Sequence, residues 1–150
     1  MSEMNRESLY SAAGEALHMG QVLELNISAL IELLNRGYNA NIAAESIILG
    51  EDKRTLGQLV VELKKRCSVS PEGVEALRTS LKARNYIAHE LFIRVTDAFR
   101  DEGAHVDALE LVKVKTREIA VGTAITQGFV SGLCQALDMK LSDLRIRQEI

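Results

Sequence analysis

The chain has 150 residues, of which 47% are hydrophobic, 26% charged and 4% aromatic. This length suits one folded domain, 1–150, and the composition excludes an intrinsically disordered chain. The formal net charge of -3 excludes a general positive field for nucleic acid, so RNA binding would need a local basic patch.

Features of secreted and membrane proteins are missing from the sequence. The polar segment 1–7 is not followed by the apolar stretch of a signal peptide, and no run approaches the roughly 18 apolar residues of a membrane span. Cys67 and Cys134 form no CxxC pair and lie in segments that we expect to be helical core. We therefore expect a cytoplasmic protein without membrane association, with both cysteines as small buried side chains.

Apolar side chains in the first half of the chain recur at three- and four-residue steps, which predicts helices. The stripe of the first helix consists of Leu9, Ala13, Ala16, Leu17, Gly20, Leu23, Ile27, Leu30, Ile31 and Leu34. This helix is expected to end near Gly37, and a shorter helical segment follows over 40–49. Another helix is predicted over 56–63, with Thr55 as its N-cap. The basic run 64–66 is interpreted as a solvated helix end, with a phosphate-attracting patch as the alternative.

The second half of the chain predicts two longer helices. Ser70-Pro71-Glu72 is a helix start, because serine caps, proline suits the first helical position and glutamate suits the positive end. The apolar stripe continues to about Arg100, where the segment 101–103 breaks it. A last helix contains the stripe from Leu109 to Leu137, and we expect its glycines to allow close helix approach: Gly122, Gly128 and Gly132. The sequence therefore predicts an all-α, up-and-down bundle of four to five helices.

One cluster of polar, chemically active side chains stands inside the helix predicted to start at Pro71. The hexapeptide Arg84-Asn85-Tyr86-Ile87-Ala88-His89 gathers a cation, an amide and an imidazole where packing requires none of them. On an ideal helix Asn85 and His89 are one turn apart, so the amide can hold the imidazole in one tautomer. Arg84 points about 140° away from His89, so its side chain must curl, the helix must distort or a second subunit must complement the site. Tyr86 is interpreted as a core residue with its hydroxyl at the edge.

We expect neither a metal nor a cofactor. His89-Glu90 begins like the HExxH zinc motif, but Ile93 stands where the second histidine is needed. His18 and His105 stand alone and are interpreted as surface or helix-end histidines. The sequence also contains no glycine-rich phosphate loop and no dinucleotide-binding fingerprint.

The hexapeptide resembles the arginine-x4-6-histidine motif of the HEPN superfamily, a group of all-helical domains common in toxin-antitoxin, abortive-infection and RNA-processing systems. The resemblance covers the motif, the helical architecture and the chain length. It implies a metal-independent endoribonuclease site formed by Arg84, Asn85 and His89, usually composed across a homodimer. Toxins of this group that are paired with a minimal nucleotidyltransferase antitoxin commonly have a tyrosine two residues after the histidine, where this chain has Leu91.

Three interpretations of the hexapeptide stay open at the level of sequence. Metal-free RNA cleavage needs a base for the 2′-hydroxyl proton and a cation for the charge on the phosphorane, roles that suit His89 and Arg84. A structural alternative is a buried polar knot in which Arg84, Asn85 and His89 fix the register of neighbouring helices. The third is a non-catalytic binding protein, an immunity protein or antitoxin that neutralises a basic toxin by charge complementarity.

Overall fold

The structure is a computed structural model that describes residues 3–43 and 53–144. In chain order its elements are α1 (Glu3–Tyr38), α3 (Lys53–Arg66), α4 (Pro71–His89), α5 (Leu91–Arg94), the 3-10 helix η1 (Thr96–Phe99), α6 (Glu102–Leu137) and the 3-10 helix η2 (Leu141–Asp143). No β-strand occurs in the described ranges. The predicted all-α class is confirmed.

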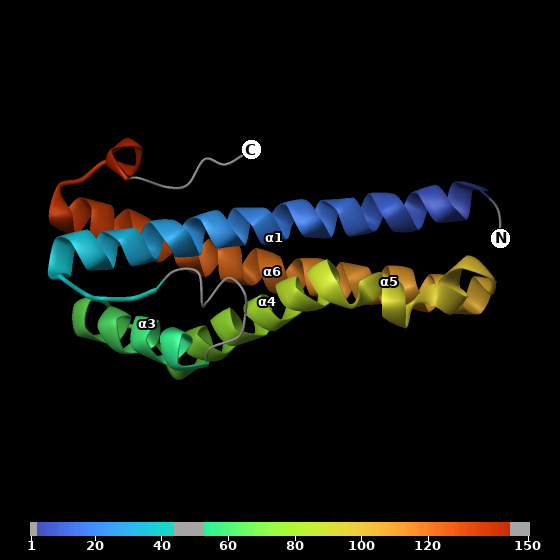
Figure 1. Cartoon of the computed structure of the whole chain (residues 1–150), viewed down its shortest axis with the longest axis horizontal. Helices are drawn as coiled ribbons and strands as arrows, with labels where there is room; N and C mark the ends of the chain where they lie inside the picture. The colour runs from blue at the N-terminus through green and yellow to red at the C-terminus, as the bar shows by residue number, and fades with distance from the viewer. Residues whose placement is uncertain (1–2, 44–52, 145–150) are drawn as a thin grey trace.

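Three long helices build the bundle (Figure 1). Helices α1 and α6 run in the same direction along the length of the molecule, and α4 runs in the opposite direction. Helix α6 packs against both α1 and α4. The ends of α1 and α6 meet where Gly37 lies against Leu137, since a Cβ atom at position 37 would overlap that leucine. This up-and-down arrangement agrees with the prediction.

The core follows the stripes that the sequence displays. Leu23, Ile27 and Leu30 of α1 are completely buried, and so is Ile119 of α6. Helix α3 contributes Leu59, which is also inaccessible to water. Burying a side chain of this size contributes about 1.5 to 3 kcal/mol relative to exposing it, so the bundle is held mainly by these apolar faces.

The helix predicted to continue from Pro71 to about Arg100 is interrupted, and this part of the prediction is wrong. Helix α4 ends at His89, because Glu90 leaves the helical conformation with a φ of -121°. A second interruption separates α5 from η1. There the hydroxyl of Thr96 donates to the carbonyl oxygens of Phe92 at 3.2 Å and Ile93 at 3.1 Å. Such local side-chain bonds compete with regular helix and favour a bend.

Two helix starts are set by capping side chains. The Ser70 hydroxyl accepts a hydrogen bond from the backbone N–H of Gly73 at 3.0 Å, which confirms the predicted start of α4. The Asp101 carboxylate accepts from the backbone N–H of Ala104 at 3.0 Å and caps α6. The segment 101–103 therefore begins the last helix. Thr55 is not an N-cap, because α3 already begins at Lys53.

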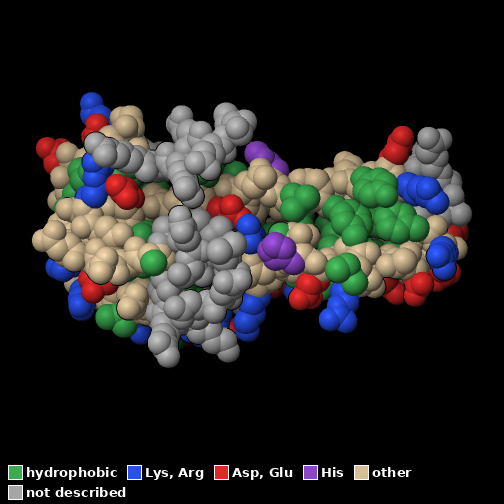
Figure 2. All heavy atoms as spheres, in the orientation of Figure 1, with side chains coloured by type: hydrophobic (Ala, Val, Ile, Leu, Met, Phe, Trp, Pro, Cys, Tyr) green, Lys and Arg blue, Asp and Glu red, His purple; other side chains and the backbone are tan. Residues whose placement is uncertain are grey.

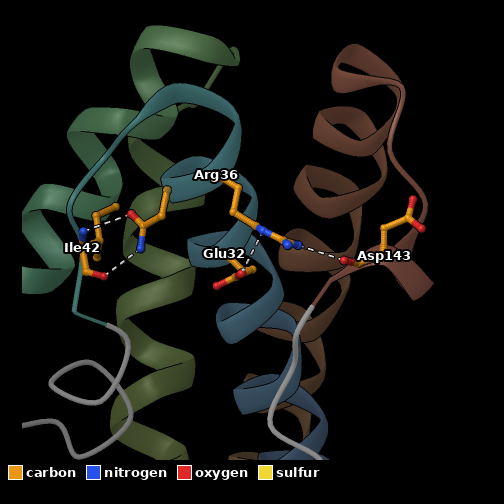
Figure 3. A network of polar contacts seen from close by, with 5 residues as sticks. Glu32, Arg36, Ile42 and Asp143 are labelled. Atoms are coloured by element: carbon orange, nitrogen blue, oxygen red, sulfur yellow. Dashed lines mark hydrogen bonds and ion pairs between the residues drawn. The ribbon is translucent and has the colours of Figure 1, made fainter.

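The chain leaving α1 is fixed by polar contacts (Figure 3). Asn39 ends the helix with a φ of 57°. The Asn35 side chain then donates to the carbonyl oxygen of Ile42 and accepts from its N–H, both at 3.0 Å. Residues 40–43 are not helical, and the rest of the helix predicted over 40–49 lies outside the described residues.

Arg36 ties the end of α1 to the C-terminal part of the described chain (Figure 3). Its Nε lies 3.3 Å from a carboxylate oxygen of Glu32, one turn earlier on the same helix. Its Nη1 donates to the backbone carbonyl oxygen of Asp143 in η2 at 2.8 Å. This arginine therefore has a structural role that links two elements.

Candidate functional site

The imidazole of His89 lies at the end of α4 and is exposed to solvent. The helix closes just after it, where the backbone N–H of Glu90 donates to the carbonyl oxygen of Tyr86 at 2.9 Å. Glu90 also lines a surface pocket of about 430 Å³ together with Ile93 and Arg94. An exposed imidazole is accessible to a ligand. Because His89 is exposed, it cannot be the centre of a buried polar knot formed with Arg84 and Asn85.

In contrast to the exposed side chain of His89, the side chain of Arg84 turns toward α1. Its Nη2 forms an ion pair with the carboxylate of Glu24, and its Nη1 donates to the side-chain oxygen of Asn85 at 2.9 Å. The side chains of Arg84 and Glu24 are 15% and 24% exposed, respectively. Two of the guanidinium nitrogens are therefore held from two directions, at a position that water still reaches.

Gly20 makes room for this arginine. A Cβ atom at position 20 would lie 3.1 Å from the Cγ atom of Arg84, which is tighter than an ordinary contact. Gly20 and Glu24 are one turn apart and so lie on the same face of α1. The glycine accommodates the aliphatic stem of Arg84, and the glutamate meets its charged end.

The electrostatics of this pair follow from its partial burial. Burial lowers the pKa of the Arg84 guanidinium, because desolvation disfavours the charged form. An arginine nevertheless keeps its proton in proteins, and the neighbouring carboxylate of Glu24 compensates its charge. Arg84 is thus a charged side chain whose charge is balanced within the bundle.

The structure brings two of the three predicted site residues into direct contact. Arg84 and Asn85 are joined by a hydrogen bond, whereas His89 lies one turn further along α4. The sequence suggests that Asn85 holds the imidazole of His89. In the structure the side-chain oxygen of Asn85 instead accepts a hydrogen bond from Arg84. Asn85 therefore orients the cation.

Glu24 is the site residue that sequence reasoning missed. It follows Leu23 on the border of the apolar stripe of α1, where a glutamate is an ordinary solvated residue. The only local indication is the one-turn spacing from Gly20, a small residue on a stripe of larger ones. The partnership with Arg84 depends on how α1 and α4 pack, which periodicity does not specify.

The remaining histidines differ from each other. His18 is exposed on α1, as predicted. His105 lies in the first turns of α6, so its place near a helix end is correct, but its side chain is buried at 5% exposure. Its Nδ1 has no hydrogen-bond partner among the described residues. The part of the chain that the structure describes contains no group of three or more His, Cys, Asp or Glu positioned to hold a metal ion.

Tyr86, Cys67 and Cys134 pack against the core. Tyr86 is half-buried against the core, with the Lys115 ammonium 5.3 Å from its ring centroid, which supports the core assignment. Cys67 and Cys134 are free thiols that are only partly buried. Burial raises the pKa of the Cys67 thiol, because desolvation disfavours the charged thiolate. Among the glycines of α6, only Gly122 makes the predicted close approach, because a Cβ at Gly128 or Gly132 would meet open space.

The basic run at the end of α3 is exposed. The Nζ of Lys65 lies 3.0 Å from a carboxylate oxygen of Glu62, and the guanidinium of Arg66 lies 4.2 Å from the ring centroid of Tyr38. These contacts favour the interpretation as a solvated helix end. Within the described ranges, no helix combines the length and apolar character that crossing a membrane requires.

An apolar patch lies where α1 meets the segment that follows the hexapeptide. We define it by Tyr10, Phe92, Ile93 and Phe99. The ring centroid of Tyr10 lies 5.6 Å from those of both Phe92 and Phe99. Tyr10, Phe92 and Ile93 are 56%, 40% and 77% exposed. Hydrophobic side chains gather on one half of the face shown in Figure 2, over the N-terminal half of α1 and the α5 region. The bend after His89 thus exposes large apolar side chains.

The comparisons with known proteins provide no further assignment. No family model, curated protein or solved structure matches the chain.

Proposed function

We propose that the protein is a HEPN-like, metal-independent endoribonuclease of a toxin-antitoxin or phage-defence type system. The observation that carries the proposal is that one helix, α4, presents both an exposed imidazole, His89, and a cation that is held in place, Arg84. These two chemical functions are those that metal-free cleavage of RNA requires.

In this mechanism each of the three residues has one role. The neutral imidazole of His89 takes the proton from the 2′-hydroxyl group, which attacks the adjacent phosphorus atom. The guanidinium of Arg84 stabilises the negative charge that develops on the phosphorane oxygens. Asn85 is a positioning residue, because its side-chain oxygen accepts the hydrogen bond from Arg84. The leaving 5′-oxygen takes up a proton from water, the imidazolium of His89 returns its proton to solvent, and a 2′,3′-cyclic phosphate remains.

The proposal includes a cytoplasmic homodimer in which two copies of the site act together on an RNA substrate. The apolar patch supports self-association, because the free energy falls when a partner covers exposed apolar surface of this kind. The opposite charges of Glu90 and Arg94 line a surface pocket together with Ile93 of the patch. In a two-fold arrangement each acidic side chain can meet the partner's basic one, since such an interface is self-complementary.

A second candidate function is that of a non-catalytic binding protein, an immunity protein or antitoxin with a toxin as its partner. The observation that favours it is the ion pair between Arg84 and Glu24. The Glu24 carboxylate balances the charge of the guanidinium, and the pair joins α1 to α4. The net charge of -3 suits a basic partner protein.

Incubation of the purified protein with end-labelled total RNA separates the two candidates. We expect cleavage that persists in EDTA and leaves 2′,3′-cyclic phosphate ends. His89→Ala should lower the cleavage rate by about 100-fold or more, the usual contribution of a general base. His18→Ala is the matched control, because it removes another exposed histidine, and it should cleave like the wild type.

A substrate with deoxyribose before the scissile phosphate lacks the nucleophile and should bind without being cut. Unchanged cleavage by His89→Ala, or equal cleavage of the deoxy substrate, would contradict the mechanism. No cleavage under any condition, together with tight binding of a basic protein, would favour the second candidate.

A further inference from the structure

Three residues of α1 and α4 contact or make room for the Arg84 side chain. Asn85 fixes Nη1, Glu24 meets Nη2, and Gly20 leaves space beside the side-chain stem. The bond to Asn85 comes from the same helix and does not depend on Glu24. The guanidinium therefore keeps the contact with Asn85 if the carboxylate moves away.

The Glu24 carboxylate offers the arginine the same chemistry as a phosphate group. Carboxylate and phosphate oxygens both accept paired, charge-assisted hydrogen bonds from the planar guanidinium fork. Glu24 also lies at the solvent edge of the bundle, with 24% of its side chain exposed. A glutamate at such an edge can rotate into water at little cost, because an exposed charge remains hydrated.

We propose that the Arg84 guanidinium is a binding site for a phosphate group of a phosphodiester, and that the Glu24 carboxylate occupies this site until the ligand displaces it. The inference rests on the proposed function, because it takes the ligand of Arg84 to be the backbone of a nucleic acid. It makes Glu24 an internal competitor that lowers affinity for phosphate ligands.

The pair Glu32–Arg36 on α1 provides a matched control. It is also an ion pair, with a glutamate side chain that is 31% exposed, close to the value for Glu24. Arg36 is additionally bonded to the backbone of Asp143, so its role is to join elements. Removing the charge of Glu32 should therefore create no phosphate site near His89.

The experiment measures dissociation constants by titration calorimetry for two probes, inorganic phosphate and an all-deoxy oligonucleotide that the proposed mechanism cannot cleave. Glu24→Gln should bind both probes at least about tenfold more tightly than the wild type, since it removes a charge that competes at close range. Glu32→Gln should match the wild type. Adding Arg84→Ala to Glu24→Gln should abolish the gain. A gain for inorganic phosphate alone would indicate a site for free phosphate and overturn the assignment to a phosphodiester.

Circular dichroism shows whether each variant is folded. Unchanged affinity in a folded Glu24→Gln protein would overturn the proposal and leave Glu24 as a structural residue. If Glu24→Gln does not fold, Glu24→Asp decides, because it draws the carboxylate back by one methylene and should give an intermediate gain. If Glu24→Asp bound the probes no more tightly than the wild type, or if neither variant folded, the proposal would also be overturned.

The outcome is independent of catalysis. A gain in phosphate affinity without any cleavage of RNA by the wild type would keep this inference and reject the ribonuclease. RNA cleavage that depends on His89, with no gain in the phosphate affinity of Glu24→Gln, would keep the ribonuclease and reject this inference.

Discussion

At the scale of single residues, Gly122 shows how closely α6 and α4 approach each other. A Cβ atom at this position would overlap the side chain of Ser80. Ser80 is completely buried, and its hydroxyl donates to the carbonyl oxygen of Leu77 at 2.7 Å. The serine cannot move aside without losing this bond, so the glycine is required by packing.

We therefore expect Gly122→Ala to lower the free energy of unfolding by about 1 to 3 kcal/mol, the usual cost of overpacking a core. Urea denaturation followed by circular dichroism measures the change. Gly128→Ala is the control in the same helix, because its Cβ would meet nothing within 4 Å. Alanine is the better helix former, so this control should be stabilised by up to about 1 kcal/mol. Equal effects of the two substitutions would contradict the close approach at Gly122.

At the scale of elements, α4 is the helix that positions the candidate site. Its start is fixed by Ser70 and by proline at the first helical position. Its end after His89 is followed by the bend that exposes Phe92 and Ile93. The helix thus presents the imidazole just before the exposed apolar side chains of α5.

Loss of the cap should weaken this helix. Ser70→Ala removes the acceptor for the N–H of Gly73, and we expect it to lower the free energy of unfolding by about 1 kcal/mol. Ser68→Ala is the control, since Ser68 is an exposed residue between α3 and α4. Thermal denaturation of the two variants makes the comparison. If Ser70→Ala were as stable as Ser68→Ala, the hydrogen bond at the cap would contribute nothing measurable.

At the scale of the whole molecule, the described bundle buries its apolar stripes in one core and leaves the patch of Tyr10, Phe92, Ile93 and Phe99 partly uncovered. The proposed homodimer would cover this surface. Association of this kind is driven by the removal of apolar area from water.

Sedimentation equilibrium tests the homodimer. We expect a dimer at micromolar concentration in the wild type, and a shift toward monomer in Ile93→Lys, because a buried lysine charge without a partner is costly. Val61→Lys is the control, since Val61 is 53% exposed on α3 and lies outside the patch. A wild-type monomer would argue against a site composed of two subunits. A dimer unaffected by Ile93→Lys would show that the interface does not include the patch.

Features that depend on neighbours along the chain could be predicted without coordinates. Apolar periodicity predicted the long helices, because one face of each must be buried, and Ser70-Pro71 marked a helix start through local hydrogen bonding. The tertiary structure alone decided that Arg84 meets Glu24, that Gly122 meets Ser80 and that His105 is buried. These contacts join residues far apart in sequence and depend on the direction and register with which helices pack. Helical periodicity identifies the face that is buried, but it does not identify the side chain that faces it.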